Sequence, residues 1–171
     1  MNQLYKMFLA INATSWVVVM YGIKEEWAIS PIPSWIFGGL LLFVPILLSV
    51  ISIVLTLLLG KDSLNDCGKL TEANSSFLPT YLAYFFVGLG IEQFQHLIFV
   101  YLIILIFTYV AQTQYFNPIF LLFGYRFYNA ETSEGTKVFL IVKKNLRRAN
   151  EVKFSNLRRI NDTTYIAWRE Q

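Results

Sequence analysis

The sequence predicts a membrane α-helical fold: four transmembrane helices followed by a small cytoplasmic β-rich module. Residues 34–60, SWIFGGLLLFVPILLSVISIVLTLLLG, contain no ionisable side chain. As a helix this run would be about 40 Å long, more than the roughly 30 Å hydrocarbon core of a bilayer. Only 15% of the 171 residues are charged, whereas a typical soluble domain has about 25%. Of the 14 Lys and Arg residues, 10 lie after residue 123.

The first predicted span covers residues 7–23. We interpret this run as a retained helix because no small-x-small cleavage site follows it and because it is longer than a usual signal-peptide core. Asn12, Thr14 and Ser15 make it the least hydrophobic of the spans, so we expect it to pack against other helices. A short loop with Pro31 and two interfacial tryptophans follows.

The second predicted span, residues 34–60, contains Pro45, which removes one backbone hydrogen bond and should kink the helix near Leu41. Small or hydroxyl residues follow one another at spacings of 7, 4, 3 and 4, which places them on one stripe. Close helix packing is the favoured interpretation of this stripe, and a pore lining is the alternative. The stripe consists of Gly38, Pro45, Ser49, Ser52 and Thr56.

The third and fourth spans are expected at residues 77–94 and 97–115, and together they resemble a helical hairpin with a polar turn. The polar, mixed-charge segment 61–76 before them is expected to be a loop or a brief surface helix. At the hairpin turn, Glu92 and His96 should lie close together at one membrane surface. They are either a sensing pair, since His titrates near neutral pH, or ordinary headgroup-level residues.

Residues 118–123 are too few to span a bilayer and are expected to lie along the inner surface, ending a transmembrane domain of residues 1–123. The remaining module, residues 124–171, should form two β-hairpins. Thr132-Ser133-Glu134-Gly135 is the turn signal of the first hairpin, and Asn161-Asp162 is that of the second.

Basic residues cluster in this module. They would attract anionic lipid and set the orientation, at about 1 kcal/mol per residue near the surface. They could also dock an acidic protein or nucleic acid, but direct nucleic-acid binding is not expected to be their primary role. The candidate partner- or lipid-binding residues are Lys143, Lys144, Arg147, Arg148, Lys153, Arg158 and Arg159.

The same charges predict the topology. By the positive-inside rule the basic tail lies in the cytoplasm, and four spans then place the N-terminus there too. One Lys or Arg is left outside and thirteen are inside. The predicted location is the bacterial inner membrane, with a multi-pass chain.

Catalytic and cofactor motifs are missing from the sequence: it contains no P-loop, GxGxxG, HExxH, GxSxG or CxxC. One His and one Cys, about 29 residues apart, do not make a Cys/His pair. We therefore expect no enzyme activity, no catalytic residue, no cofactor and no metal site.

The order of these elements resembles the KwaA family, the membrane subunits of Kiwa antiphage defence systems. The resemblance covers the whole chain and rests on four spans, the run YFNPIFLLFGYRFYN from Tyr115 to Asn129, and the short basic β tail. It implies an inner-membrane homo-oligomer, a tetramer in the family, that senses infection at the envelope. It also implies a cytoplasmic DNA-binding partner, KwaB, recruited by the membrane subunit.

Independently of the resemblance, a lipid-embedded body with a basic cytoplasmic module suits a membrane sensor and scaffold that works with a soluble effector. Two alternatives remain. One is a small homo-oligomeric channel that uses the stripe of the second span, and the other is an accessory or immunity protein that blocks or stabilises another membrane protein.

Overall fold

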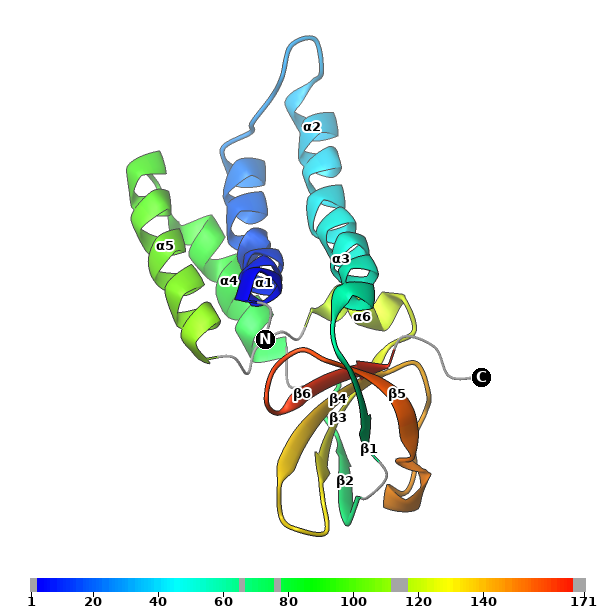
Figure 1. The fold of residues 1–171 in the computed structure, drawn as a ribbon. Helices are drawn as coiled ribbons and strands as arrows, with labels where there is room; N and C mark the ends of the chain where they lie inside the picture. Colours follow the sequence, from blue (N-terminus) through cyan, green and yellow to red (C-terminus); the bar gives the residue numbers. More distant parts are fainter. Residues whose placement is uncertain (1–2, 65–66, 76–77, 112–116, 168–171) are drawn as a thin grey trace.

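The computed structural model describes residues 3–64, 67–75, 78–111 and 117–167. A group of helices stands on a β-sheet, with the loop that follows the first helix at the end far from the sheet (Figure 1). The helices are α1 (Gln3–Lys24), α2 (Ser34–Leu41), α3 (Phe43–Leu55), the 3₁₀ turn η1 (Thr56–Leu58), α4 (Leu78–Gly90), α5 (Phe94–Ala111) and α6 (Pro118–Leu122).

Three helical segments among the described residues are long and apolar enough to cross a membrane: Gln3–Lys24, Ser34–Leu58 and Phe94–Ala111. The fourth apolar helix, α4, has 13 residues, which corresponds to about 20 Å. The structure therefore supports an α-helical membrane protein with three candidate spans and one shorter apolar helix beside them.

The second span is interrupted close to the position at which the kink is predicted. The helix is interrupted at Leu42, between α2 and α3, three residues before Pro45. Proline has no backbone N–H to bond the carbonyl four residues earlier, and its ring clashes with that carbonyl, so the break falls in the preceding turn.

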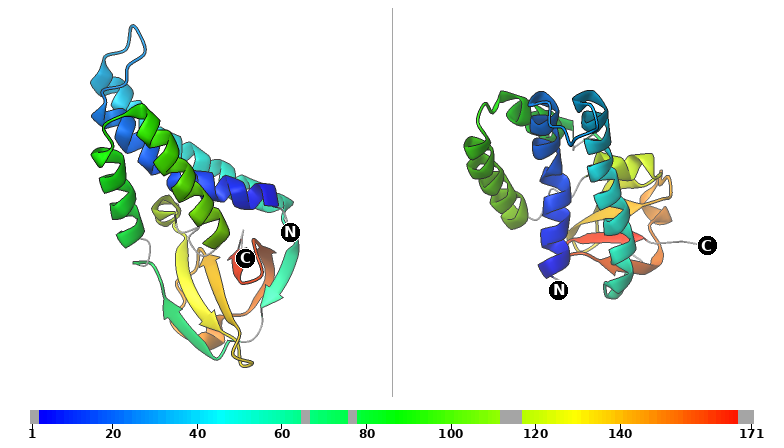
Figure 2. Two further views of the ribbon diagram at one scale, coloured as in Figure 1. Left: turned by 90° about the vertical axis from the view of Figure 1, so that its left-hand side faces the viewer. Right: turned by 90° about the horizontal axis from the view of Figure 1, so that it is seen from above.

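Helix α1 is the centre of the helical layer and contacts α3, α4 and α5. Viewed from above, α1 and the α2–α3 rod lie across the sheet while α4 and α5 stand to one side (Figure 2). The contact between α1 and α4 is close at Gly88, where an added Cβ would lie 2.6 Å from the carbonyl oxygen of Val17. Glycine at this position lets the two helix backbones approach.

The sheet has six strands in the order β1-β5-β6-β4-β3-β2. Both predicted hairpins are confirmed: Arg126 pairs with Val142 and Glu131 with Lys137 in the first, and Leu157 pairs with Ala167 in the second. The two hairpins meet through a parallel pairing of β4 with β6. The strands are β1 (Lys61–Leu64), β2 (Lys69–Glu72), β3 (Arg126–Glu131), β4 (Lys137–Val142), β5 (Phe154–Arg159) and β6 (Thr164–Ala167).

The expectation of a loop or surface helix at 61–76 is wrong for the described part of that segment, which forms the two edge strands. Strand β1 pairs with β5, and β2 pairs with β3. Both strands are short and largely exposed, so they lack the apolar alternation by which a half-buried strand is recognised in a sequence. Their conformation is decided by pairing with strands about 60 to 100 residues further along the chain.

The sheet must be strongly curled, because residues 65–68 connect its two edges. Six strands in a flat sheet would put the edges about 24 Å apart. The chain from Leu64 to Lys69 reaches at most about 18 Å. Curling encloses one apolar core on one face of the sheet, with Leu140 and Leu157 fully buried.

A second apolar core joins the other face of the sheet to the helices. Tyr5 and Leu9 of α1 and Phe120 of α6 pack with Phe127 and Ile166 of the sheet. This second core therefore joins the helices to the sheet.

Candidate functional site

A cluster of buried polar side chains lies where the helices meet the sheet. We call it the polar junction, and it consists of Tyr5 and Asn12 of α1, Ser49 and Ser52 of α3, and Asn117. The exposed fraction of Asn12 is 1%, that of Asn117 is 2%, and the two serines are completely buried. Buried amides and hydroxyls need partners, and here the side chains supply them to one another.

Asn117 is the link between the two helices and α6. Its Nδ2 donates to Ser49 Oγ at 2.7 Å and to Asn12 Oδ1 at 3.1 Å. Its Oδ1 accepts from the backbone N–H of Ile119 at 3.0 Å, which caps the N-terminus of α6. Both ends of this one amide are therefore in use, one toward the helices and the other toward α6.

The remaining bonds of the polar junction join α1 to α3. Asn12 Nδ2 donates to Ser52 Oγ at 3.1 Å and to Ser49 Oγ at 3.3 Å, while Tyr5 donates its hydroxyl to the Ser52 carbonyl at 3.1 Å. The serine hydroxyls donate within α3, Ser49 to the carbonyl of Pro45 and Ser52 to that of Leu48. The Ser49 hydroxyl also lies 3.4 Å from a second acceptor, Asn12 Oδ1.

Helix α6 is in turn fixed to the sheet. The N–H of Tyr125 donates to the carbonyl of Phe120 at 2.9 Å, and the two rings lie 5.9 Å apart. Gly124 between α6 and β3 has a φ of +80°, a value that favours glycine at this turn. Consecutive contacts therefore connect Asn117, α6 and the residue that precedes β3.

The structure places the stripe of the second span against α1 over most of its length. Pro45, Ser49, Ser52 and Thr56 are buried, and Gly38 is half-buried near Ile23. Within one chain, the hydroxyls of Ser49 and Ser52 bond Asn12 and Asn117, so they face a neighbouring helix of the same molecule.

Sequence reasoning missed Asn117. The signal that could have found it is an Asn directly before Pro118 at the start of a short apolar run, because Asn is a preferred N-cap and Pro is favoured at the first helical position. Its bond to Asn12 crosses 105 positions of sequence and has no local signal.

The basic residues of the tail divide into two groups, and the first lies near the helices. Arg158 donates from Nη1 to the carbonyl of Leu59 at 2.8 Å, which ties β5 to the chain just after η1. Lys143 Nζ lies 4.9 Å from the ring centre of Tyr125. Burial raises the pKa of the Tyr125 phenol, so the ring stays neutral and the contact is a cation–π interaction.

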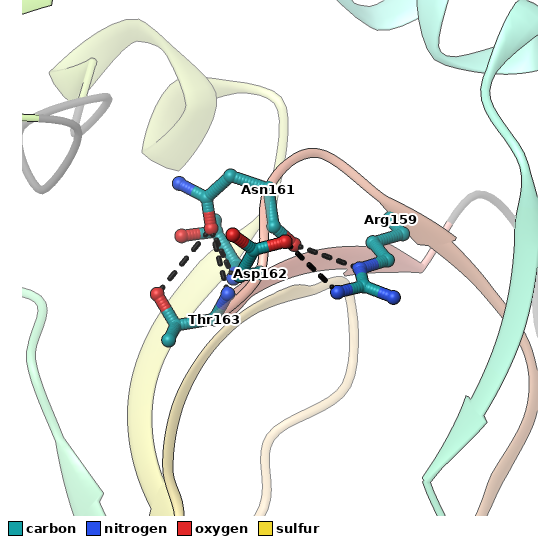
Figure 3. A network of polar contacts seen from close by, with 5 residues as sticks. Arg159, Asn161, Asp162 and Thr163 are labelled. Atoms are coloured by element: carbon teal, nitrogen blue, oxygen red, sulfur yellow. Dashed lines mark hydrogen bonds and ion pairs between the residues drawn. The ribbon is translucent and has the colours of Figure 1, made fainter. Parts of the chain in front are cut away.

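Arg159 holds the turn of the second hairpin (Figure 3). It donates to the carbonyl of Asn161 at 3.2 Å and to Asp162 at 3.0 Å. The side chain of Asn161 accepts from the N–H groups of Thr163 and Thr164, at 2.8 and 2.7 Å. The predicted Asn-Asp turn is therefore an Asx-type turn braced by an arginine.

The second group lies at the end of the sheet away from the helices, around the 3₁₀ turn η2 (Ala149–Glu151), which is the orange turn at the lower right of Figure 1. Arg147, Arg148 and Lys153 are exposed there, and we call them the far-end cations. The backbone N–H of Arg147 donates to Glu151 at 2.9 Å, which orders the turn and leaves the Arg147 side chain exposed. Lys144 is exposed as well.

Glu92 and His96 lie at the opposite end of the molecule. Both are exposed, Glu92 in the α4–α5 turn and His96 in the first turn of α5; this turn lies at the end of the helices away from the sheet (Figure 1). Beside them, Lys24 Nζ donates to the carbonyl of Ile91 at 2.7 Å and pairs with Glu25 at 2.9 Å. The structure therefore brings neither the acid nor the imidazole together with the buried polar residues.

A hollow of about 660 Å³ lies on the sheet between the β3–β4 hairpin and the β5–β6 turn. Its lining includes Lys69, Asn129, Glu131, Lys137 and Thr163. The register places Glu131 opposite both lysines, so the charges of this surface partly offset each other. No group of three or more His, Cys, Asp or Glu residues that could hold a metal ion occurs among the described residues.

Comparison with protein families gives one match, to the family described as anti-phage protein KwaA, over residues 5–166. Comparisons with curated proteins and with solved structures give no significant match. The matched range runs from the first turn of α1 to β6 and so includes the helices, the polar junction and the sheet. The chain belongs to the KwaA family of anti-phage proteins.

Proposed function

We propose that the protein is the membrane sensor and scaffold of an anti-phage defence complex, and that it recruits a cytoplasmic DNA-binding effector to the bacterial inner membrane. Membership of the family implies the role in anti-phage defence. The observation that carries the finer proposal is the division of the molecule: apolar helices at one end, and three exposed cations at the far end of a sheet joined to them.

The sheet supports a topology of four crossings. Strands β2 and β3 pair with each other, so the α4–α5 segment between them begins and ends on the same side of the membrane. Strand β1, which follows α3, belongs to the same sheet. We therefore propose α4 as the fourth span despite its 13 residues, since a short apolar helix can be accommodated by local thinning of the bilayer.

The charges support an orientation with the sheet and both termini in the cytoplasm. Of the 13 Lys and Arg residues that the structure describes, 12 lie in α1 before its midpoint, in the sheet or in its connections, and Lys24 alone lies at the other end. This asymmetry follows the positive-inside rule. The exposed apolar side chains of α3 and α5 would then face lipid or other copies in a homo-oligomer, a tetramer by family resemblance.

The proposed dock for the effector, KwaB by family resemblance, is the surface of the far-end cations. Arg147, Arg148 and Lys153 are exposed and flank η2, and this segment lies away from the helices (Figure 1), so an acidic protein surface could approach it without meeting the bilayer. We do not propose a catalytic role for any residue. We also do not propose a pore lined by Ser49 and Ser52, because their hydroxyls are bonded inside the chain.

The test is a full-length variant with Arg147→Gln, Arg148→Gln and Lys153→Gln, expressed in the native host with its neighbouring genes. We expect capture of the soluble partner in a mild-detergent pull-down to fall at least tenfold, and protection against phage to be lost. The matched control neutralises Lys61, Lys69 and Lys137 to Gln, the same change of charge elsewhere on the sheet. Undiminished capture and protection in the far-end variant would refute the proposed dock.

A further inference from the structure

We propose that Asn117 is a latch that links the relative position of α1 and α3 to α6 and the start of β3. A single amide nitrogen bonds one acceptor from each helix, Asn12 Oδ1 at 3.1 Å and Ser49 Oγ at 2.7 Å. A slide of α3 along α1 cannot preserve both distances. It must break one bond or carry Asn117 with it.

Burial favours states in which the hydrogen bonds of Asn117 are either fully formed or exchanged for others. Asn12 and Asn117 are at least 98% buried, so water cannot replace a lost partner. A buried hydrogen bond is strong, and a buried donor or acceptor without a partner is costly. Geometries in which the bonds are only partly formed are therefore disfavoured. Two packed arrangements with different bonds are the usual form of a structural switch.

The helices that Asn117 links are connected differently at their two ends. The α2–α3 rod is interrupted at Leu42. Residues 25–33 join the end of α1 to the start of α2, at the side of the helices away from the sheet. On the sheet side, α3 is held by the bond from Arg158 to the Leu59 carbonyl. We therefore expect a conformational change in residues 25–33 to shift α3 relative to α1 at the level of the polar junction.

A reversible disulfide between α1 and α2, at the end of these helices away from the sheet, tests the latch without phage or partner. An ideal Cβ on Gly38 lies 3.7 Å from Ile23 Cγ1, so Ile23→Cys with Gly38→Cys places two sulfurs within reach of a disulfide. The background is Cys67→Ser, which removes the native cysteine. The full chain is placed in lipid nanodiscs, and amide hydrogen exchange of residues 117–123 is compared in the oxidised and reduced states.

With the latch intact, oxidation should slow exchange in α6 about fivefold, the effect expected from one hydrogen bond. In Asn12→Leu the link to α1 is cut while the cap from Asn117 to Ile119 remains, and the ratio of oxidised to reduced exchange rates should fall to about one. Because the readout is a ratio within one variant, general loosening of the fold does not mimic this result.

Two further variants keep the test decisive. Ser49→Ala removes the α3 side of the latch with a smaller change, and it replaces Asn12→Leu if that variant does not fold. Ser15→Ala is the control, because Ser15 is buried in α1 and donates only to the carbonyl of Asn12 in its own helix at 2.7 Å. The proposal would be overturned if oxidation slowed exchange equally in the latch variants and in the unaltered latch. It would also be overturned if oxidation had no effect in the unaltered latch. If the far-end cations proved not to bind the partner, the proposal of the latch would be unaffected.

Discussion

The polar junction and the far-end cations are both polar, but their surroundings are opposite. At the junction, neutral amides and hydroxyls are buried and every side chain is hydrogen-bonded within the chain. At the far end, three cationic side chains are exposed around a short turn. Polar groups that are buried and bonded support stability, whereas exposed charges contribute little to it and are available for binding. Substitutions in the two regions should therefore separate stability from recognition.

The largest effect is expected for Asn117→Leu. This change removes the α6 cap and both bonds to the helices. It takes one donor from Asn12 Oδ1 and one from Ser49 Oγ in a buried site, while Ser49 keeps its bonds to Asn12 and Pro45. We expect the free energy of unfolding to fall by about 3 kcal/mol. Heating the detergent-solubilised protein and measuring the loss of its size-exclusion peak gives the change in midpoint. Asn156→Leu, an exposed position on β5, should stay near wild type, and equal losses in both variants would contradict the comparison.

An intermediate effect is expected for Arg158→Met. Arg158 bonds the Leu59 carbonyl, and methionine keeps much of the apolar stem without the donor, so the loss should be about 1–2 kcal/mol. The matched variant is Arg148→Met, at an exposed far-end cation, for which the change should stay below about 0.5 kcal/mol. The same heating assay measures both. A larger loss in Arg148→Met would show that the two groups of basic residues are divided wrongly.

The smallest effect on stability is expected for the triple neutralisation of Arg147, Arg148 and Lys153. Their side chains are exposed, so the unfolding midpoint should change by less than the equivalent of about 0.5 kcal/mol. Measuring the midpoint and partner capture on one preparation separates the two effects. A large drop in midpoint would mean that these residues support the fold, and that lost capture would then not identify a dock.

Local sequence signals were sufficient for several parts of the fold. The apolar run 34–60, its break before Pro45 and both C-terminal hairpins follow from chain composition and turn residues within a few positions of one another. The basic residues were identified as a set, but their division was not predictable. Only their contacts in the folded chain show that the side chains of Arg158 and Arg159 bond the Leu59 carbonyl and the second hairpin turn, whereas Arg147 and Arg148 lie exposed beside η2.

Two features could be read from the sequence alone: which segments are apolar enough to be candidate membrane spans, and where the hairpins turn. Both follow from hydrophobic length and turn propensity, which are local properties. The remaining features depend on contacts between distant parts of the chain. Two short polar segments became edge strands because distant strands offered them backbone partners. Asn12 and Asn117 met across 105 positions because burial at the polar junction left each amide dependent on the other.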